Sequence, residues 1–156
     1  MNEETQTPAA SSAASSAKKS PPKSARRWAR ELALQGLYQW RVGGADAAAI
    51  EADLPNLEGY RKADRELCRT LARGVFNEHP ALTAQLADAL DRPFDELSPI
   101  ESILLLIATY ELIHFPETPY RVILNEAIEL AKVFGGEDGH RYVNGVLDKV
   151  ALKLRP

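Results

Sequence analysis

Three arginines near the start of the predicted fold are the side chains best suited to binding a polyanion. They are Arg26, Arg27 and Arg30, and Tyr38 follows in the same predicted helix. Advancing by about 100° per residue from Arg26, the other two arginines fall at about 40° and 100° and Tyr38 at about 120°. Trp28 and Leu32 fall at about 200° and 240°. This spacing predicts that the arginines point away from the core, with an aromatic ring at their edge.

An arginine cluster beside a tyrosine suits single-stranded RNA. Guanidinium groups bind phosphate oxygens bidentately, and a ring stacks on an unpaired base, each stack contributing roughly 1–3 kcal/mol. The alternative interpretation is a solvated helix face with a tyrosine at the rim of the core. These residues alone leave the two interpretations open.

Residues that could support catalysis or bind a metal are scattered. The three histidines lack metal-ligand spacing, and the only cysteine, Cys68, lies on an apolar helix face where a thiol usually acts as a small buried hydrophobe. Two glycine pairs, at residues 43–44 and 135–136, follow no strand and are interpreted as helix stops. The histidines are His79, His114 and His140. We therefore expect no enzymatic activity, no metal and no cofactor.

Charge is distributed unevenly along the 156 residues. Residues 1–30 hold six lysines and arginines and two glutamates, so their net charge is +4. Because the whole chain has a net charge of −3, residues 31–156 carry −7. A basic segment on an acidic body indicates a localised polyanion contact, or a tail that improves solubility. The alanine, serine and lysine content of residues 1–23 predicts a disordered tail, and residues 24–156 are predicted to form one domain.

Capping signals and apolar periodicity predict a single-domain, all-α helical bundle of about six to seven helices. Ser24 and the glycines at 43–44 delimit a first helix over 25–42, and a short helix follows Asp46 as far as Pro55. The segments 64–77 and 81–90 are predicted to be two helices that form a hairpin, with Pro80 in the first turn of the second helix. Ser98, Pro99 and Glu101 form a capping box that starts a central helix over 100–113. Thr118 and Pro119 are predicted to start the next helix in the same way, which ends at 135–136, and a last helix covers 140–154.

Neither a membrane span nor a secretory signal is apparent. The longest apolar run, Ile103 to Ala108, is far shorter than the roughly 18 residues that a span requires. The lone cysteine excludes an internal disulfide. We expect a cytoplasmic protein that does not enter a membrane.

Two stretches resemble the NusB antitermination family. One is ARRWARELALQGLYQW, residues 25–40, and the stronger comprises IESILLLIATYEL, residues 100–112, and TPYRVILNEAIELAKVFGGEDGHRYVNGVLDKVA, residues 118–151. The similarity begins at about Ala25 and is weakest between Ala45 and Leu97. The resemblance implies an all-helical protein that binds boxA RNA of ribosomal RNA transcripts together with the ribosomal small-subunit protein NusE, within an RNA polymerase antitermination complex.

The resemblance also implies roles for individual residues. Those on the RNA side are Arg26, Arg27, Arg30, Tyr38, Asp138, Arg141 and Tyr142, and those facing NusE are Glu101 and Asp95. Glu101 is equally explained as part of the capping box, and Asp138 as a loop cap or as a residue that orients Arg141. Trp28 departs from an arginine present in some members, and the helical indexing places it toward the interior.

Two other functional classes are alternatives. Some RNA cytosine methyltransferases carry a NusB-like domain, but this chain ends at Pro156 without a strand–glycine–helix unit for a methyl donor. A purely protein-binding helical scaffold is the third class. Because family members pair through the same basic surface, we expect a monomer or a weak homodimer.

Overall fold

The computed structural model describes residues 22–156, which fold into six α-helices and four short 3₁₀ turns and contain no strand. The helices are α1 (Ala25–Gly43), α2 (Ala47–Asp53), α3 (Arg65–Leu86), α4 (Pro99–His114), α5 (Tyr120–Phe134) and α6 (Gly139–Leu154). The predicted all-α bundle is confirmed. Residues 1–21 of the predicted tail lie outside the described residues.

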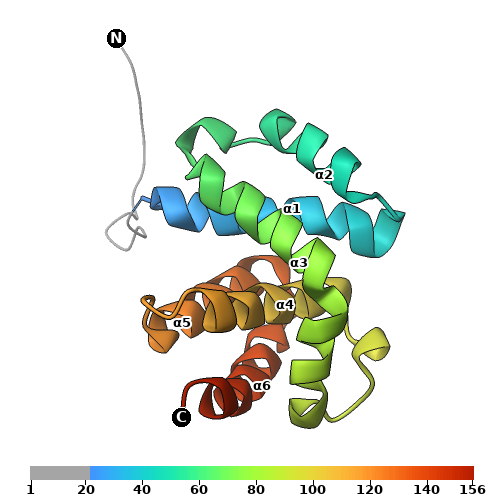
Figure 1. Cartoon of the computed structure of the whole chain (residues 1–156), viewed down its shortest axis with the longest axis vertical. Coiled ribbons are helices and arrows are strands. Elements are labelled where there is room, and N and C mark those ends of the chain that lie inside the picture. Colours follow the sequence, from blue (N-terminus) through green and yellow to red (C-terminus); the bar gives the residue numbers. More distant parts are fainter. Residues whose placement is uncertain (1–21) are drawn as a thin grey trace.

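Helix α4 lies at the centre of the bundle. It packs against α1 and α3 in one part of the molecule and against α5 and α6 in the other, as Figure 1 shows. Every residue from Ser102 to Leu112 is buried, which confirms the prediction drawn from its all-round apolar pattern. Any charged side chain on this buried helix therefore needs an oppositely charged or hydrogen-bonding partner inside the protein.

Local capping fixes both ends of α1 and the start of α4. The Ser24 Oγ accepts a hydrogen bond from the backbone N–H of Arg27 at 3.0 Å, and Gly44 ends α1 in the left-handed conformation with a φ of 76°. At α4, the Ser98 Oγ accepts from the N–H of Glu101 at 3.2 Å. The predicted boundaries at these positions are confirmed.

The predicted hairpin around Pro80 is wrong. Helix α3 continues through Pro80 and changes direction along its length, as Figure 1 shows. A proline inside a helix removes one backbone hydrogen bond and bends the helix, but it does not force the helix to end. Buried side chains on both sides of Pro80, such as Val75 and Leu82, pack into the same core, so the helix continues across the bend.

The predicted cap at Thr118 is also wrong. Helix α5 begins at Tyr120, Pro119 occupies the capping position, and no side chain caps this end. The Thr118 carbonyl instead accepts a hydrogen bond from the Arg155 Nη1 at 2.8 Å. The Arg155 side chain therefore helps to hold the turn that precedes α5.

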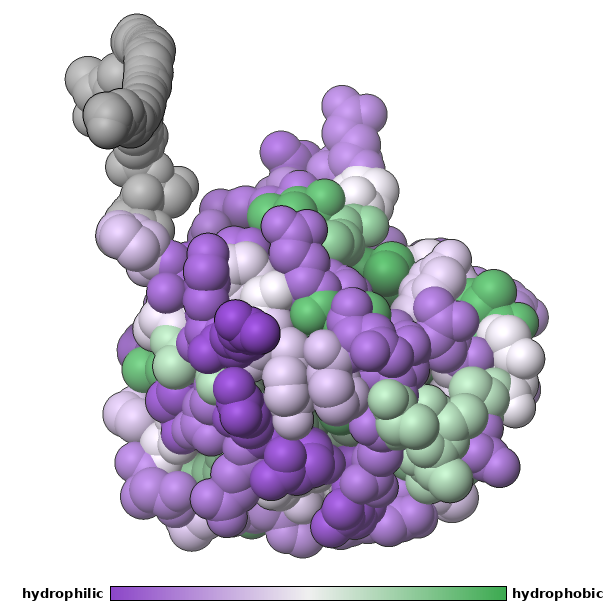
Figure 2. All heavy atoms as spheres, turned by 90° about the horizontal axis from the view of Figure 1, so that it is seen from above, coloured by the Kyte–Doolittle hydropathy of each residue, from purple (hydrophilic) through white to green (hydrophobic). Residues whose placement is uncertain are grey.

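The face of the molecule seen from above in Figure 2 is largely polar. On the face seen in Figure 2, hydrophilic side chains predominate and hydrophobic ones form separate patches. Among residues 22–156, no helix is both long enough and apolar enough to cross a membrane.

Candidate nucleic-acid interface

Arg30 lies inside the protein, and the prediction that it points outward is wrong. Only 4% of its surface is exposed. Its Nε and Nη2 donate to the two carboxylate oxygens of Glu111 on α4, each at 2.8 Å, and the Glu111 side chain is 2% exposed. Arg30 therefore joins α1 to the central helix in a buried, bidentate ion pair.

The direction of Arg30 follows from two leucines that the helical indexing left out. On the same count, Leu37 falls at about 20° and Leu34 at about 80°, on either side of Arg30 at about 40°. Both leucines are buried. A second signal was the acidic residue Glu111 within an otherwise apolar central helix, because a buried carboxylate requires a cationic partner.

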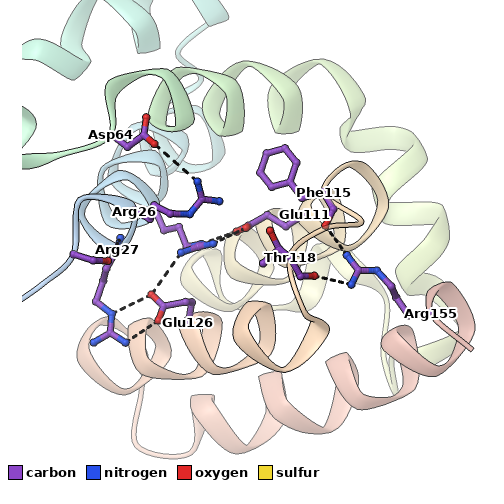
Figure 3. A network of polar contacts seen from close by, with 10 residues as sticks. Arg26, Arg27, Asp64, Glu111, Phe115, Thr118, Glu126 and Arg155 are labelled. Carbon is purple, nitrogen blue, oxygen red and sulfur yellow. Dashed lines mark hydrogen bonds and ion pairs between the residues drawn. The ribbon is translucent and has the colours of Figure 1, made fainter.

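Arg27 lies at the surface, but a carboxylate holds one edge of its guanidinium. Its Nε and Nη2 donate to Glu126 of α5 at 3.0 and 2.7 Å, and 32% of its side chain is exposed (Figure 3). The Nη1 has no hydrogen-bond partner among residues 22–156. Glu126 also lies 3.8 Å from the Arg30 Nη1, so one carboxylate faces both arginines.

These contacts raise the pKa values of both arginines. For Arg27 the main cause is the hydrogen bonding to Glu126. For Arg30, burial lowers the pKa, but the hydrogen bonds to Glu111 and the charges of Glu111 and Glu126 outweigh it. Both guanidinium groups are therefore permanently charged and locally neutralised by carboxylates.

Arg26 is the most exposed of the three arginines. Its side chain is 47% exposed and its Nη1 lies 3.9 Å from the Asp64 Oδ2. Figure 3 shows the two side chains pointing toward each other. The depression that it lines also contains Glu66 and Glu117. The arginine cluster consequently has carboxylates around it and presents only Arg26 and part of Arg27 to solvent.

Trp28 is half-buried, not a member of the main core. Its ring covers Gly59, whose φ is 93°. The Lys23 ammonium lies 4.1 Å and the Lys62 ammonium 5.4 Å from the ring centroid. The ring therefore packs the segment before α3 against α1. Two lysines lie beside position 28, where some family members have an arginine.

Tyr38 lies on the exposed side of α1, as predicted, and 37% of its surface is accessible. It borders an open depression of about 370 Å³. The other lining residues come from α1, α4, α5 and the loop before α3: Leu34, Gln35, Gln39, Leu57, Ile100 and Phe134. Tyr38 is thus accessible for stacking, next to a largely apolar hollow.

A second cluster lies around the start of α6. The Tyr142 hydroxyl donates to the Asp91 Oδ1 at 3.1 Å, and the Arg92 guanidinium donates to both Asp91 oxygens at 2.9 and 3.1 Å. Arg92 also lies 5.1 Å from the Tyr142 ring centroid. The hydrogen bonds from Arg92 and Tyr142 lower the pKa of Asp91. Sequence reasoning missed Asp91 and Arg92, which lie about fifty residues from Tyr142 in the chain.

Asp138 and Arg141 are highly exposed in this second cluster. Their side chains are 80% and 79% exposed, and the Asp138 Oδ1 lies 3.8 Å from the Arg141 Nη1. This distance is consistent with the interpretation that Asp138 orients Arg141. The Asp138 side chain makes no capping hydrogen bond to α6. Both side chains are available to a partner.

Glu101 joins the start of α4 to the start of α6. Its backbone N–H donates a hydrogen bond to the Ser98 Oγ, which confirms the serine half of the predicted capping box. Its Oε2 would lie 2.9 Å from a Cβ at Gly139, so the carboxylate packs against the first residue of α6. Asp95 is exposed in the 3₁₀ turn Phe94–Glu96 just before α4. The NusE-facing role of these two acids stays a prediction.

Arg155, which sequence reasoning also missed, holds the loop between α4 and α5. Its guanidinium donates to the carbonyls of Leu112, Phe115 and Thr118 at 3.1, 2.8 and 2.8 Å, and Figure 3 shows it pointing into that loop. A cation at the C-terminal end of α4 also complements the helix dipole. The arginine nearest the end of the chain therefore has a structural role.

Among residues 22–156, the remaining reactive side chains form no metal site. Cys68 is buried, and burial raises the pKa of its thiol to about 11, so it stays protonated at neutral pH. The described residues hold no cluster of histidine, cysteine, aspartate and glutamate suited to a metal ion.

Comparison with known proteins identifies the relatives of this chain. The model of the NusB family matches residues 27–152. Transcription antitermination protein NusB of Dechloromonas aromatica (strain RCB) is 62% identical over 132 residues, covering 85% of this chain and 81% of that protein. The NusB protein of Burkholderia cenocepacia (strain HI2424) is 61% identical over 132 residues, covering 85% and 91%.

Two solved structures have the same fold. T. maritima NusB matches with a TM-score of 0.74 and 28% identity, covering 86% of this chain and 96% of that one. A structure of the antitermination factors NusB and NusE in complex with dsRNA matches with a TM-score of 0.70 and 20% identity, covering 81% and 96%. The family match over most of the chain, together with relatives that are named as transcription antitermination proteins and not as enzymes, shows that this chain belongs to the NusB family.

Proposed function

We propose that this protein is a transcription antitermination factor that binds single-stranded boxA-type RNA of ribosomal RNA transcripts together with the small-subunit protein NusE. The observation that carries the proposal is the family match over residues 27–152. A protein of the same fold has been solved with NusE and dsRNA, which supports these two classes of partner. The proposed setting is the RNA polymerase antitermination complex in the cytoplasm, with the free protein a monomer or a weak homodimer.

The proposed RNA surface comprises two groups of accessible residues. At one end, Arg26 and the open Nη1 edge of Arg27 bind phosphate, while Tyr38 stacks on a base. Around the start of α6, the residues are Asp138, Arg141 and Tyr142. Glu101 and Asp95 face NusE. Arg30 is left out of the RNA surface because it is buried against Glu111.

The carboxylates around the arginines predict weak binding to RNA alone. Asp64 and Glu126 compensate two of the positive charges that phosphate would otherwise meet. Few free cations imply that few counterions are released, so both the affinity and its salt dependence are small. A second contact through NusE raises the effective concentration of the RNA at this surface.

The test is a titration of labelled boxA-type RNA at several salt concentrations, with and without NusE. We expect NusE to tighten binding. The double variant Arg26→Ala/Arg27→Ala should bind more weakly, and the slope of log affinity against log salt should shrink by up to about 1.4, at roughly 0.7 per phosphate.

The matched control is Arg73→Ala. Arg73 on α3 also donates two hydrogen bonds to a carboxylate, that of Glu51, at 3.0 and 2.6 Å, but it lies outside the proposed surface. This control should bind RNA like the wild type. Equal binding by the double variant and the wild type would overturn the proposed surface, and no gain from NusE would overturn shared recognition.

A further inference from the structure

We infer that a groove between α5 and α6 binds an extended peptide segment of a protein partner. The groove consists of two adjoining depressions of about 250 and about 230 Å³, which share Tyr120 and Asp148. Asn125 and Asn144 hold the peptide backbone. Asp148 binds a basic side chain of the segment, and a hollow beside Leu152 takes an apolar one. The inference goes beyond the proposed function, because this groove is separate from the surface proposed for RNA and NusE.

The groove runs along α6 away from the RNA surface. Its lining residues on α6 begin at Asn144, after Arg141, and end at Arg155. The end at Arg155 lies beside the C-terminal end of α4, because Arg155 donates to the Leu112 carbonyl at 3.1 Å. Glu101 lies at the other end of α4, about 16 Å away along the helix axis at about 1.5 Å per residue. The far end of the groove is therefore distant from a residue proposed to face NusE.

The lining residues form one stripe on each helix. On α6, Asn144, Asp148 and Leu152 are four residues apart and share one face. On α5, Leu124 and Ile128 have the same spacing. The stripe on α6 is about 12 Å long at about 1.5 Å per residue, which matches about four residues of extended chain at roughly 3.3 Å each.

Two asparagines in the groove suit a peptide backbone. Asn125 lies on α5 and Asn144 on α6, both are exposed, and both line the same depression. From residue 22 to the end of the chain, neither side-chain amide has a hydrogen-bond partner. An amide offers two donors and an acceptor, which match the C=O and the N–H of a peptide group. Two amides on adjacent helices can therefore hold a backbone whatever side chains it carries.

The charges of the groove favour a peptide with a basic side chain. Asp148 is exposed, lines both depressions and forms no ion pair within residues 22–156. The Arg155 guanidinium is directed elsewhere, because it donates to three backbone carbonyls. A carboxylate without a partner attracts a lysine or arginine of the ligand. Arg121 lies over the Tyr120 ring, 5.3 Å from its centroid, and is the one lining cation left for an anion. A nucleic acid would meet this single cation beside the repelling Asp148, so it suits the groove less well.

The end of the groove provides a place for an apolar side chain. Leu152 is 75% exposed and Tyr120 is 36% exposed, and both line the depression of about 250 Å³. They come from different helices and lie with Ala151 around one hollow. An apolar side chain placed there removes its own surface and that of Leu152 from water. A segment that combines a basic and an apolar residue therefore fits the groove.

The test is fluorescence polarisation of labelled octapeptides titrated with the full-length protein. Each octapeptide carries one lysine and one leucine, at varied spacing, among alanines and serines. We expect at least one spacing to bind, and Asn125→Ala/Asn144→Ala to weaken that binding about tenfold, because the hydrogen bonds of two amides are lost. Asn77→Ala, which changes an exposed asparagine on α3 outside the groove, is the matched control and should bind like the wild type.

Two further measurements separate specific contacts from a general loss of structure. Asp148→Lys reverses the charge of the groove, so it should prefer octapeptides in which glutamate replaces the lysine. Methylation of single backbone nitrogens of the peptide should weaken wild-type binding about tenfold at one position or more. The same methylation should affect the double asparagine variant far less, because that variant has already lost the contacts to the backbone.

Several outcomes would overturn the inference. They are no octapeptide binding by the wild type, equal binding by the double asparagine variant, and an unchanged preference for lysine in Asp148→Lys. Displacement of the bound octapeptide by NusE would make the groove part of the NusE surface and would overturn the separate site. The double asparagine variant should bind RNA with NusE like the wild type, and weaker RNA binding would likewise overturn the separation.

Discussion

The two ends of the proposed RNA surface use arginines in opposite ways. At the start of α1, Arg30 is 4% exposed and donates from Nε and Nη2 to the two carboxylate oxygens of Glu111. Arg141 near the start of α6 is 79% exposed beside an Asp138 side chain that is 80% exposed. The residue type is the same, but burial differs. Arg30 at the first end holds two helices together, and Arg141 at the second end is open to a partner.

Burial also sets the energetic consequence of losing either arginine. Two charges taken from water gain from each other only when both are present, so removal of one leaves an expensive unpaired charge. An exposed pair is solvated on both sides and contributes at most about 1 kcal/mol. The two ends should therefore respond differently to the same substitution.

The largest effect is expected from Arg30→Ala. The Glu111 carboxylate would remain buried without its partner, and we expect the free energy of unfolding to fall by about 3–5 kcal/mol. Urea denaturation followed by circular dichroism measures this change. A loss below 1 kcal/mol would mean that the pair is solvated and that the contrast between the two ends is false.

A smaller effect is expected from Glu126→Gln, which weakens the hold on Arg27 without changing side-chain shape. With this charge removed, Arg27 meets phosphate without a competing carboxylate, so RNA affinity should rise about threefold at low salt and the salt slope should steepen by up to about 0.7. RNA titration at several salt concentrations tests this. Weaker RNA binding by this variant would show that Glu126 positions Arg27 for RNA and does not compete with it.

The smallest effect on folding is expected from Arg92→Ala at the second end. Its partner Asp91 is exposed, so we expect no measurable change in the free energy of unfolding. The same denaturation experiment provides the comparison with Arg30→Ala. A loss of several kcal/mol would show that the cluster at α6 is a structural centre as well.

Local signals in the sequence predicted much of the fold. Ser24 and Ser98 each accept a hydrogen bond from an N–H three residues ahead, and Gly44 takes the left-handed conformation that glycine favours, so these helix ends depend on adjacent residues alone. The central position of α4 followed from its uniformly apolar composition. Pro80 misled the prediction because it is compatible with both a first turn and a bent interior, and only packing on both sides of it decides between them.

The site was harder to predict, because its key partners are distant in sequence. Glu111 and Glu126 lie 81 and 99 residues from the arginines that they bind bidentately, Arg30 and Arg27 respectively. Helical indexing describes one helix and cannot show which neighbour faces an arginine. Asp91 beside Tyr142 was missed for the same reason.

The most direct test of the account is the salt dependence of RNA binding by the double variant Arg30→Met/Glu111→Leu. This variant replaces a buried ion pair with apolar side chains, which usually costs little stability, and circular dichroism checks that it folds. Because Arg30 is buried in an ion pair and the proposed phosphate contacts are Arg26 and Arg27, the variant should keep the wild-type salt slope. A slope reduced by as much as in Arg26→Ala/Arg27→Ala would show that Arg30 binds RNA and would contradict the account.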